Sequence, residues 1–185
     1  MTDHELRLYF GGMKPSLPSS RVVPLCLLLA GLVFLAGSAP AVDWPNWRGP
    51  AHNGRSEEGA FHWNWNQRAP QVLWRATIGY GYSSVAVSTG KVFAMGNIKG
   101  TDHVFAFNAV TGREAWRYTY PCISIDLDTY PGPRSTPAVA GDQVYTLSRL
   151  GHLLCINFDT GQLHWSRDMR SDFKGVLPLW GYSGS

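Results

Sequence analysis

The chain has 185 residues with a formal net charge of +3, and residues 42–185 hold thirteen Lys or Arg against eleven Asp or Glu. This near-neutral, interspersed charge argues against a nucleic-acid-binding surface. The sequence contains no Gly-x-Ser-x-Gly, phosphate-loop or Cys-x-x-Cys pattern, so hydrolase, nucleotide and thiol-redox chemistry have no support in it.

Residues 1–41 are predicted to be a secretory signal peptide. The stretch 22–37 is almost continuously apolar, follows two basic residues, and precedes Ala39-Pro40-Ala41, an A-x-A cleavage pattern. We prefer cleavage after this pattern to an uncleaved anchor, because the run is short for a membrane span and contains Pro24. Acidic residues near the start are untypical of a signal, so Met13 is an alternative start. The mature protein would be exported to the periplasm or cell envelope, or secreted, without a transmembrane span.

The rest of the chain reads as strands separated by turns. Short apolar or alternating runs are divided by Thr-Gly, Gly-Asp and Leu-Gly turn signals and by a four-residue turn at 97–100, which is typical of antiparallel hairpins. The first predicted segment is a Trp/Pro/Gly-rich N-terminal extension at 42–70. The second, 71–185, is a partial propeller. It holds a lone outer strand at 72–76, two four-stranded units at 83–119 and 134–168, and the start of another unit at about 180. No inner strands precede 72–76, so we expect its partners to come from outside this chain.

An eleven-residue motif at 106–116 recurs at 155–165, a spacing of 49. Its Asn and Thr side chains can accept backbone N–H groups, its Gly tolerates positive φ, and its final Trp offers an apolar surface that a neighbouring unit must cover. A period of about 40 to 50 residues is typical of propellers and solenoids. The sequence therefore predicts an all-β fold, an incomplete β-propeller of four-stranded antiparallel blades. The motif residues are Asn108, Thr111, Gly112, Trp116, Asn157, Thr160, Gly161 and Trp165.

The motif resembles the signature of the pyrroloquinoline-quinone (PQQ)-type propeller repeat, Ala-x-Asp-x-x-Thr-Gly-x-x-x-Trp. The first copy departs from it only at Asn108, and the second at Cys155 and Asn157. The opening segment 43–54 also resembles the start of large exported PQQ-like propeller proteins of bacteria. The resemblance covers nearly all of 43–185 and implies an N-terminal fragment of an exported member of this quinoprotein-type family, because two blades alone would leave unpaired edges and uncovered Trp faces.

The resemblance implies two classes of function. Quinoprotein alcohol dehydrogenases bind PQQ and Ca²⁺ over the propeller axis, whereas scaffolds such as the outer-membrane assembly lipoprotein are catalytically inert. The dehydrogenase site includes a calcium cluster of Glu, Asn and Asp, an Asp base, an Arg and commonly an adjacent cysteine pair, and neither a Cys-Cys pair nor an assignable carboxylate set occurs here. We expect a binding or scaffold module with no catalytic residue or metal site of its own. The alternative is a PQQ/Ca²⁺-dependent dehydrogenase oxidising an alcohol or sugar, the only reading under which PQQ and calcium would be cofactors.

Three loops lead into the innermost strands of the predicted blades, and innermost strands line the axial channel of a propeller. We call these the axial loops: 79–84, 130–136 and 180–185. Their side chains would offer a cation and aromatic rings to a protein or small-molecule ligand that is anionic, planar or peptide-like. The alternative is that they pack the loops and seal the channel mouth. The candidate residues are Tyr82, Tyr130, Arg134, Trp180 and Tyr182.

The remaining polar candidates have simpler interpretations. Asp126 and Asp128 are expected to lie in a solvated loop, because calcium needs about six oxygen ligands and the surrounding pattern does not supply them. The histidines show no paired metal spacing, and His103 and His152 occupy equivalent places in the two units, which suggests a repeated structural role. Cys122 and Cys155 are expected to be free or separately buried thiols.

Cleavage after Ala41 can be checked directly. The exported protein is expected to begin at Val42 when its N-terminus is determined by sequencing or mass spectrometry. Recovery of the intact apolar stretch in a membrane fraction would instead support the uncleaved anchor.

Overall fold

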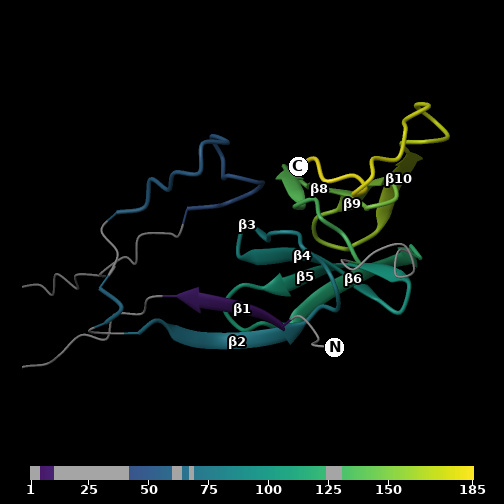
Figure 1. Ribbon diagram of the computed structural model, residues 1–185. Helices are drawn as coiled ribbons and strands as arrows, with labels where there is room; N and C mark the ends of the chain where they lie inside the picture. The colour runs from purple at the N-terminus through teal and green to yellow at the C-terminus, as the bar shows by residue number, and fades with distance from the viewer. Residues whose placement is uncertain (1–4, 11–41, 60–63, 67–68, 124–130) are drawn as a thin grey trace, which may run out of the picture.

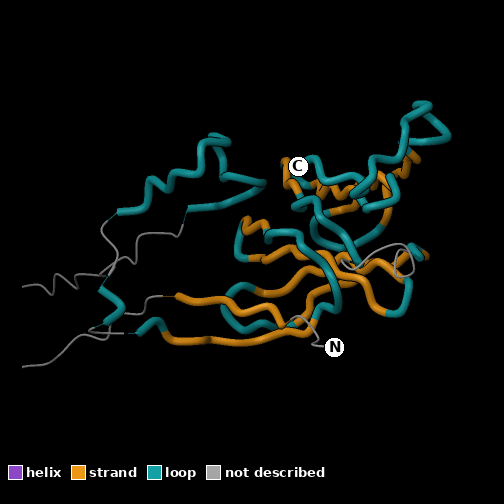
Figure 2. Tube along the Cα trace, in the orientation of Figure 1, coloured by secondary structure: helices purple, strands orange, loops and turns teal. Residues whose placement is uncertain are grey.

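The computed structural model in Figure 1 describes residues 5–10, 42–59, 64–66, 69–123 and 131–185. Tyr130, the Asp126 and Asp128 pair, and nearly all of the predicted signal peptide lie outside the described residues. Within the described part of the chain there are ten strands and no helix (Figure 2).

The strands form three antiparallel sheets. Two of them are four-stranded, and in each the strands follow one another in chain order, as blades of a propeller do. The predicted all-β fold of four-stranded antiparallel blades is confirmed. The sheets are β1 (Glu5–Phe10) with β2 (Gln71–Thr77); the first blade, β3 (Ala86–Ser88), β4 (Lys91–Ile98), β5 (Thr101–Asn108) and β6 (Glu114–Pro121); and the second blade, β7 (Ala138–Ala140), β8 (Gln143–Leu147), β9 (His152–Asn157) and β10 (Leu163–Asp168).

The β4–β5 hairpin is longer than the sequence predicts. The expected four-residue turn at 97–100 is a two-residue turn, with Lys99 at φ 52° and Gly100 at φ 82°, the conformation of a tight type I′ hairpin. Asn97 therefore belongs to β4, where its amide is fully buried and donates to Asp102 Oδ1 at 2.7 Å. An Asn normally signals a turn, but here a buried carboxylate holds it inside the strand.

The Trp that ends each repeat joins one sheet to the next. Trp116 Nε1–H donates to the Phe158 carbonyl at 2.9 Å, and a Cβ at Gly161 would lie only 2.8 Å from its ring. Trp74 of β2 makes the same contacts one sheet earlier, donating to the Ala109 carbonyl at 2.9 Å and lying against Gly112. The Gly of each repeat motif, Gly112 or Gly161, is thus required for close approach of the preceding Trp as well as for its positive φ.

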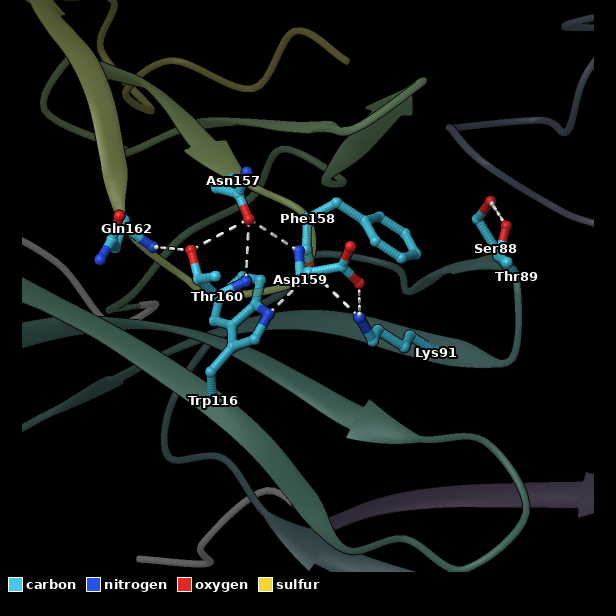
Figure 3. A network of polar contacts seen from close by, with 9 residues as sticks. All are labelled: Ser88, Thr89, Lys91, Trp116, Asn157, Phe158, Asp159, Thr160 and Gln162. Atoms are coloured by element: carbon cyan, nitrogen blue, oxygen red, sulfur yellow. Dashed lines mark hydrogen bonds and ion pairs between the residues drawn. The ribbon is translucent and has the colours of Figure 1, made fainter.

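Figure 3 shows the polar contacts around the Trp116 junction. Asn157 Oδ1 accepts the backbone N–H of Asp159 at 3.0 Å and of Thr160 at 2.9 Å, which shapes the turn that receives the Trp. Lys91 reaches across from the first blade to Asp159 at 2.6 Å and lies over the Phe158 ring at 4.2 Å. The predicted turn-forming role of the motif Asn is confirmed.

The apolar core lies between the sheets rather than within one of them. One cluster joins the two blades through Phe93, Trp116 and Phe158, with Phe93 5.8 Å from the Trp116 ring and 5.2 Å from the Phe158 ring. A second cluster joins β2 to the first blade through Trp74 and Phe107. A blade therefore completes its core only against its neighbour.

The start of the N-terminal extension, residues 43–45, bonds to the innermost strands of both blades. Trp44 exchanges two backbone hydrogen bonds with Val87 of β3, and the Pro45 carbonyl accepts Val139 N–H of β7 at 2.8 Å. Asp43 accepts the Ser88 hydroxyl at 2.7 Å. These three residues thus connect the innermost strands of the two blades.

The expectation that the strand at 72–76 finds no partner within this chain is wrong. In the structure β2 pairs with β1 from Glu5 to Phe10, as Figure 1 shows. The physical reason is the alternation Glu5-Leu6-Arg7-Leu8, which is a strand signal, beside a β2 edge with unpaired backbone groups. Cleavage after Ala41 would remove β1 and leave this edge of β2 without that partner.

Cys122 and Cys155 are both buried, free thiols, as predicted. Cys155 occupies the place of Ala106 in the first blade, and both residues are fully buried opposite the Trp of their repeat. Burial raises the pKa of the Cys122 thiol to about 12, so Cys122 is protonated and unreactive at neutral pH.

The contacts of Trp116 predict that two chemically identical substitutions will change the free energy of unfolding by different amounts. Trp116→Phe removes one of the hydrogen bonds to the Phe158 carbonyl and should lower the free energy of unfolding by about 1 to 2 kcal/mol. Trp165→Phe changes the same repeat position where the ring is 38% exposed, and should cost less than about 0.5 kcal/mol. Urea-induced unfolding of both variants measures the difference, and equal losses would contradict the junction as described.

Gly96 should tolerate no side chain. A Cβ there would lie 1.8 Å from the Ile78 carbonyl oxygen, a backbone atom that cannot rotate away, so Gly96→Ala should lower the free energy of unfolding by about 1 to 3 kcal/mol. Gly184→Ala is the matched control, because a Cβ at Gly184 meets nothing within 4 Å. A stable Gly96→Ala variant would show that the segment leading from β2 to β3 does not press on β4.

Candidate functional site

The axial loops lie in a row and are joined by hydrogen bonds. Tyr82 N–H donates to the Pro133 carbonyl at 2.8 Å, which links the first loop to the second. Thr136 N–H donates to Ser185 Oγ at 2.7 Å, which links the second loop to the third. These bonds hold the described parts of the three loops together on one side of the two blades.

Within this row the structure brings together Tyr82 and Arg134. The Arg134 guanidinium lies over the Tyr82 ring at 5.8 Å from its centroid, within the range of a cation–π contact. The Tyr82 side chain is 48% exposed. Arg134 itself is half-buried, so the pair presents an exposed aromatic ring with a partly covered cation beside it.

Trp180 and Tyr182 lie in the third axial loop. Tyr182 N–H donates to the Arg149 carbonyl at 2.9 Å, and its hydroxyl donates to the Val176 carbonyl at 3.1 Å. Trp180 is exposed. The structure therefore places Tyr182 against the β8–β9 turn, and Trp180 toward solvent.

Sequence reasoning missed Arg149, which is only 4% exposed. It lies in the β8–β9 turn, where an Arg normally points into water. A Cβ at Gly181 would lie 2.3 Å from Arg149 Cγ, so the third axial loop packs directly on this side chain. Nothing in the local sequence signals this burial, because the covering loop is more than thirty residues away.

A buried polar network lies near the first axial loop, at the end of the first blade that carries the β4–β5 turn. Asp102 is fully buried and accepts the Asn97 amide at 2.7 Å and the Tyr120 hydroxyl at 3.3 Å. Asn97 also donates to the Cys122 carbonyl at 2.9 Å. Burial raises the pKa of Asp102, and burial together with the Asp102 carboxylate raises the pKa of Tyr120 well above its usual value.

A crevice of about 390 Å³ opens beside this network, at the outer rim between the two blades. We call it the rim crevice. His152 Nε2 and Asp168 Oδ2 face each other across a 4.0 Å gap there. The other lining residues are Tyr118, Tyr120, Pro121, Leu154, Ser166, Arg167 and Asp172.

His103 and His152 hold equivalent strand positions but have different surroundings. His103 stacks on Phe105 with ring centroids 5.6 Å apart, and burial lowers the pKa of its imidazole. His152 is bonded to Ser148 and faces Asp168. The single structural role predicted for both residues holds for His103, whereas His152 lines a crevice.

Among the described residues, no group of three or more His, Cys, Asp or Glu side chains is arranged to hold a metal ion. We therefore derive no chemical step through a calcium ion or a quinone. None of the same residues forms a helix long and apolar enough to cross a membrane.

Comparison with known proteins gives one family and several structures. The family model described as "Outer membrane protein assembly factor BamB" matches residues 64–171, more than half of the chain. A quinohemoprotein alcohol dehydrogenase from Comamonas testosteroni is similar with a TM-score of 0.53 and 19% identity, over 74% of this chain and 21% of that protein. No curated protein matches the chain.

Two further structures are more distant. A europium-containing methanol dehydrogenase has a TM-score of 0.44 and 17% identity, over 56% of this chain and 20% of that protein. BamB from Moraxella catarrhalis has a TM-score of 0.35 and 16% identity, over 52% of this chain and 27% of that protein. The chain thus spans about a fifth of the length of the dehydrogenases that it matches.

The four-stranded blades joined by Trp and Gly define a β-propeller of the PQQ-type repeat class, present here as two complete blades. The chain belongs to the PQQ-like repeat family whose model is described as outer membrane protein assembly factor BamB. The predicted family is confirmed.

Proposed function

We propose that this chain is part of an exported PQQ-like β-propeller that acts as a binding or scaffold module in the periplasm or cell envelope. Its ligand, a protein or a small molecule, would bind on the axial loops. The observation that carries the proposal is the contact between the exposed Tyr82 ring and the half-buried Arg134, on loops that are already joined by hydrogen bonds.

Two physical features support a binding role for this surface. Tyr and Arg are enriched at protein interfaces, because each combines a broad apolar surface with a polar group. The loops are joined before any ligand arrives, so less conformational entropy is lost on binding. The family description, outer membrane protein assembly factor, is that of a protein that works with other proteins.

The alternative function is a PQQ/Ca²⁺-dependent dehydrogenase. It is favoured by the fold similarity to the quinohemoprotein alcohol dehydrogenase, a similarity that extends to the fold alone. PQQ would supply the oxidising group in such an enzyme. The two functions differ in what the purified protein does with added quinone and Ca²⁺.

A photoreactive amino acid placed at position 82 tests the binding surface in cells. We expect cross-linking of position 82 to an envelope protein, and loss of that adduct when Arg134→Ala is also present. Position 142 is the control, because the β7–β8 turn lies at the other end of the blade.

Equal cross-linking from positions 82 and 142 would argue against a specific axial-loop surface. An alcohol-dependent reduction of dye by the purified protein with PQQ and Ca²⁺ would favour the dehydrogenase. Cross-linking thus tests where the ligand binds, and dye reduction tests whether the protein is a scaffold or an enzyme.

A further inference from the structure

His152 is held in one orientation at the rim crevice. Ser148 Oγ accepts the backbone N–H of Gly151 at 3.1 Å and of His152 at 2.9 Å, so both of its lone pairs are used. We assign its own hydrogen to Nδ1 of His152, 3.0 Å away, although Tyr120 and Cys122 are also hydrogen-bonding neighbours of Ser148. The neutral imidazole then carries its proton on Nε2, the atom that faces Asp168. His152 therefore presents a hydrogen-bond donor to the crevice.

Asp168 is held in a complementary way. Its Oδ1 accepts the backbone N–H of Arg170 at 2.7 Å and of Ser171 at 3.0 Å. These hydrogen bonds, of which the one from Ser171 has the largest effect, lower the pKa of Asp168. Asp168 is therefore ionised at neutral pH. Its Oδ2 remains directed toward His152, and both side chains are about one-third exposed. Asp168 therefore presents an acceptor that a solute can reach.

The 4.0 Å between His152 Nε2 and Asp168 Oδ2 is too long for a direct hydrogen bond. A hydroxyl oxygen can lie about 2.8 Å from both atoms at once, accepting from one and donating to the other. The fixed pair is therefore complementary to a neutral group that is both a donor and an acceptor.

The walls of the rim crevice add aromatic surface beside this pair. Tyr118 and Tyr120 are half-buried, have ring centroids 6.2 Å apart, and are fixed by packing on the core cluster between the blades. The electron-rich face of an aromatic ring attracts polarised C–H groups. A pyranose has hydroxyls at its edge and C–H groups on its faces, and the crevice volume suits a ligand of this size.

The preceding sheet junction shows that the repeat does not produce such a crevice automatically. The residues two and four places after Trp74 are Ala76 in β2 and Ile78 just beyond it, and both pack against the second core cluster. Thr119, rather than an acid, stands opposite His103, where Asp168 stands opposite His152. The tyrosines and the carboxylate occur together only at the junction between the two described blades.

We propose that the rim crevice binds a neutral sugar, with one hydroxyl bridging His152 and Asp168 and a C–H face packed on Tyr118 or Tyr120. The site is separate from the axial loops and stands whether or not the function proposed for those loops is correct. It involves no covalent step.

The test is a titration of the chain with glucose, N-acetylglucosamine and maltose, followed by the NMR signals of the His152 imidazole. We expect a saturable shift with at least one sugar, with a dissociation constant on the order of 1 mM. Asp168→Asn should weaken binding at least about tenfold, because it removes a charge-assisted hydrogen bond. Asp142→Asn, which changes an exposed carboxylate elsewhere on the same blade, should leave binding unchanged.

The indole N–H signal of Trp116 reports in each variant that the junction between the blades is intact. Tyr118→Ala is a second variant, which keeps the His152–Asp168 pair but removes one wall, and it should also weaken binding about tenfold. The proposal is overturned if no sugar gives a saturable shift, or if binding survives both Asp168→Asn and Tyr118→Ala. A shift produced by N-methylacetamide but by none of the sugars would overturn it in favour of an amide-binding site.

Discussion

The interaction on which the structure depends is the hydrogen bond from a Trp indole to a backbone carbonyl of the next sheet. It occurs twice with the same length, from Trp74 to Ala109 and from Trp116 to Phe158. In each case the ring also lies on the Gly of a Thr-Gly turn. Because the bond satisfies a buried N–H while the ring fills the space between sheets, it fixes both the distance and the angle between neighbouring blades. Every surface between blades follows from that placement.

The two junctions share this contact but differ beyond it. At the first, small and aliphatic side chains after Trp74 fill the outer rim. At the second, Tyr118 and Tyr120 stand in their place, and the rim stays open as a crevice with His152 and Asp168 across it. The axial loops differ from the rim in another way, since they are joined by hydrogen bonds of their own. The Trp–Gly contact is thus the same at both junctions, whereas the side chains of the loops and of the outer rim differ and can bind different ligands.

Much of the fold could be predicted because its signals are local. Asn157, Thr160 and Gly161 bond or pack within a few residues of themselves, so their turn is readable in the sequence. The hairpin at Lys99 and Gly100 was predicted at the right place but with the wrong ends, because the burial of Asn97 depends on Asp102 and Cys122. The pairing of β1 with β2 was missed because it joins segments more than sixty residues apart.

The sequence by itself determined that this is an all-β repeat, where its blades lie, and that the motif Trp must be covered by a neighbouring unit, since a repeated motif carries its own turn and its own contact surface. Only the tertiary structure decided the sites. It paired Arg134 with Tyr82, buried Arg149 under the third axial loop, and set His152 4.0 Å from Asp168. These contacts join side chains from different loops and strands, and their geometry depends on how β-sheets twist and pack, which no local pattern specifies.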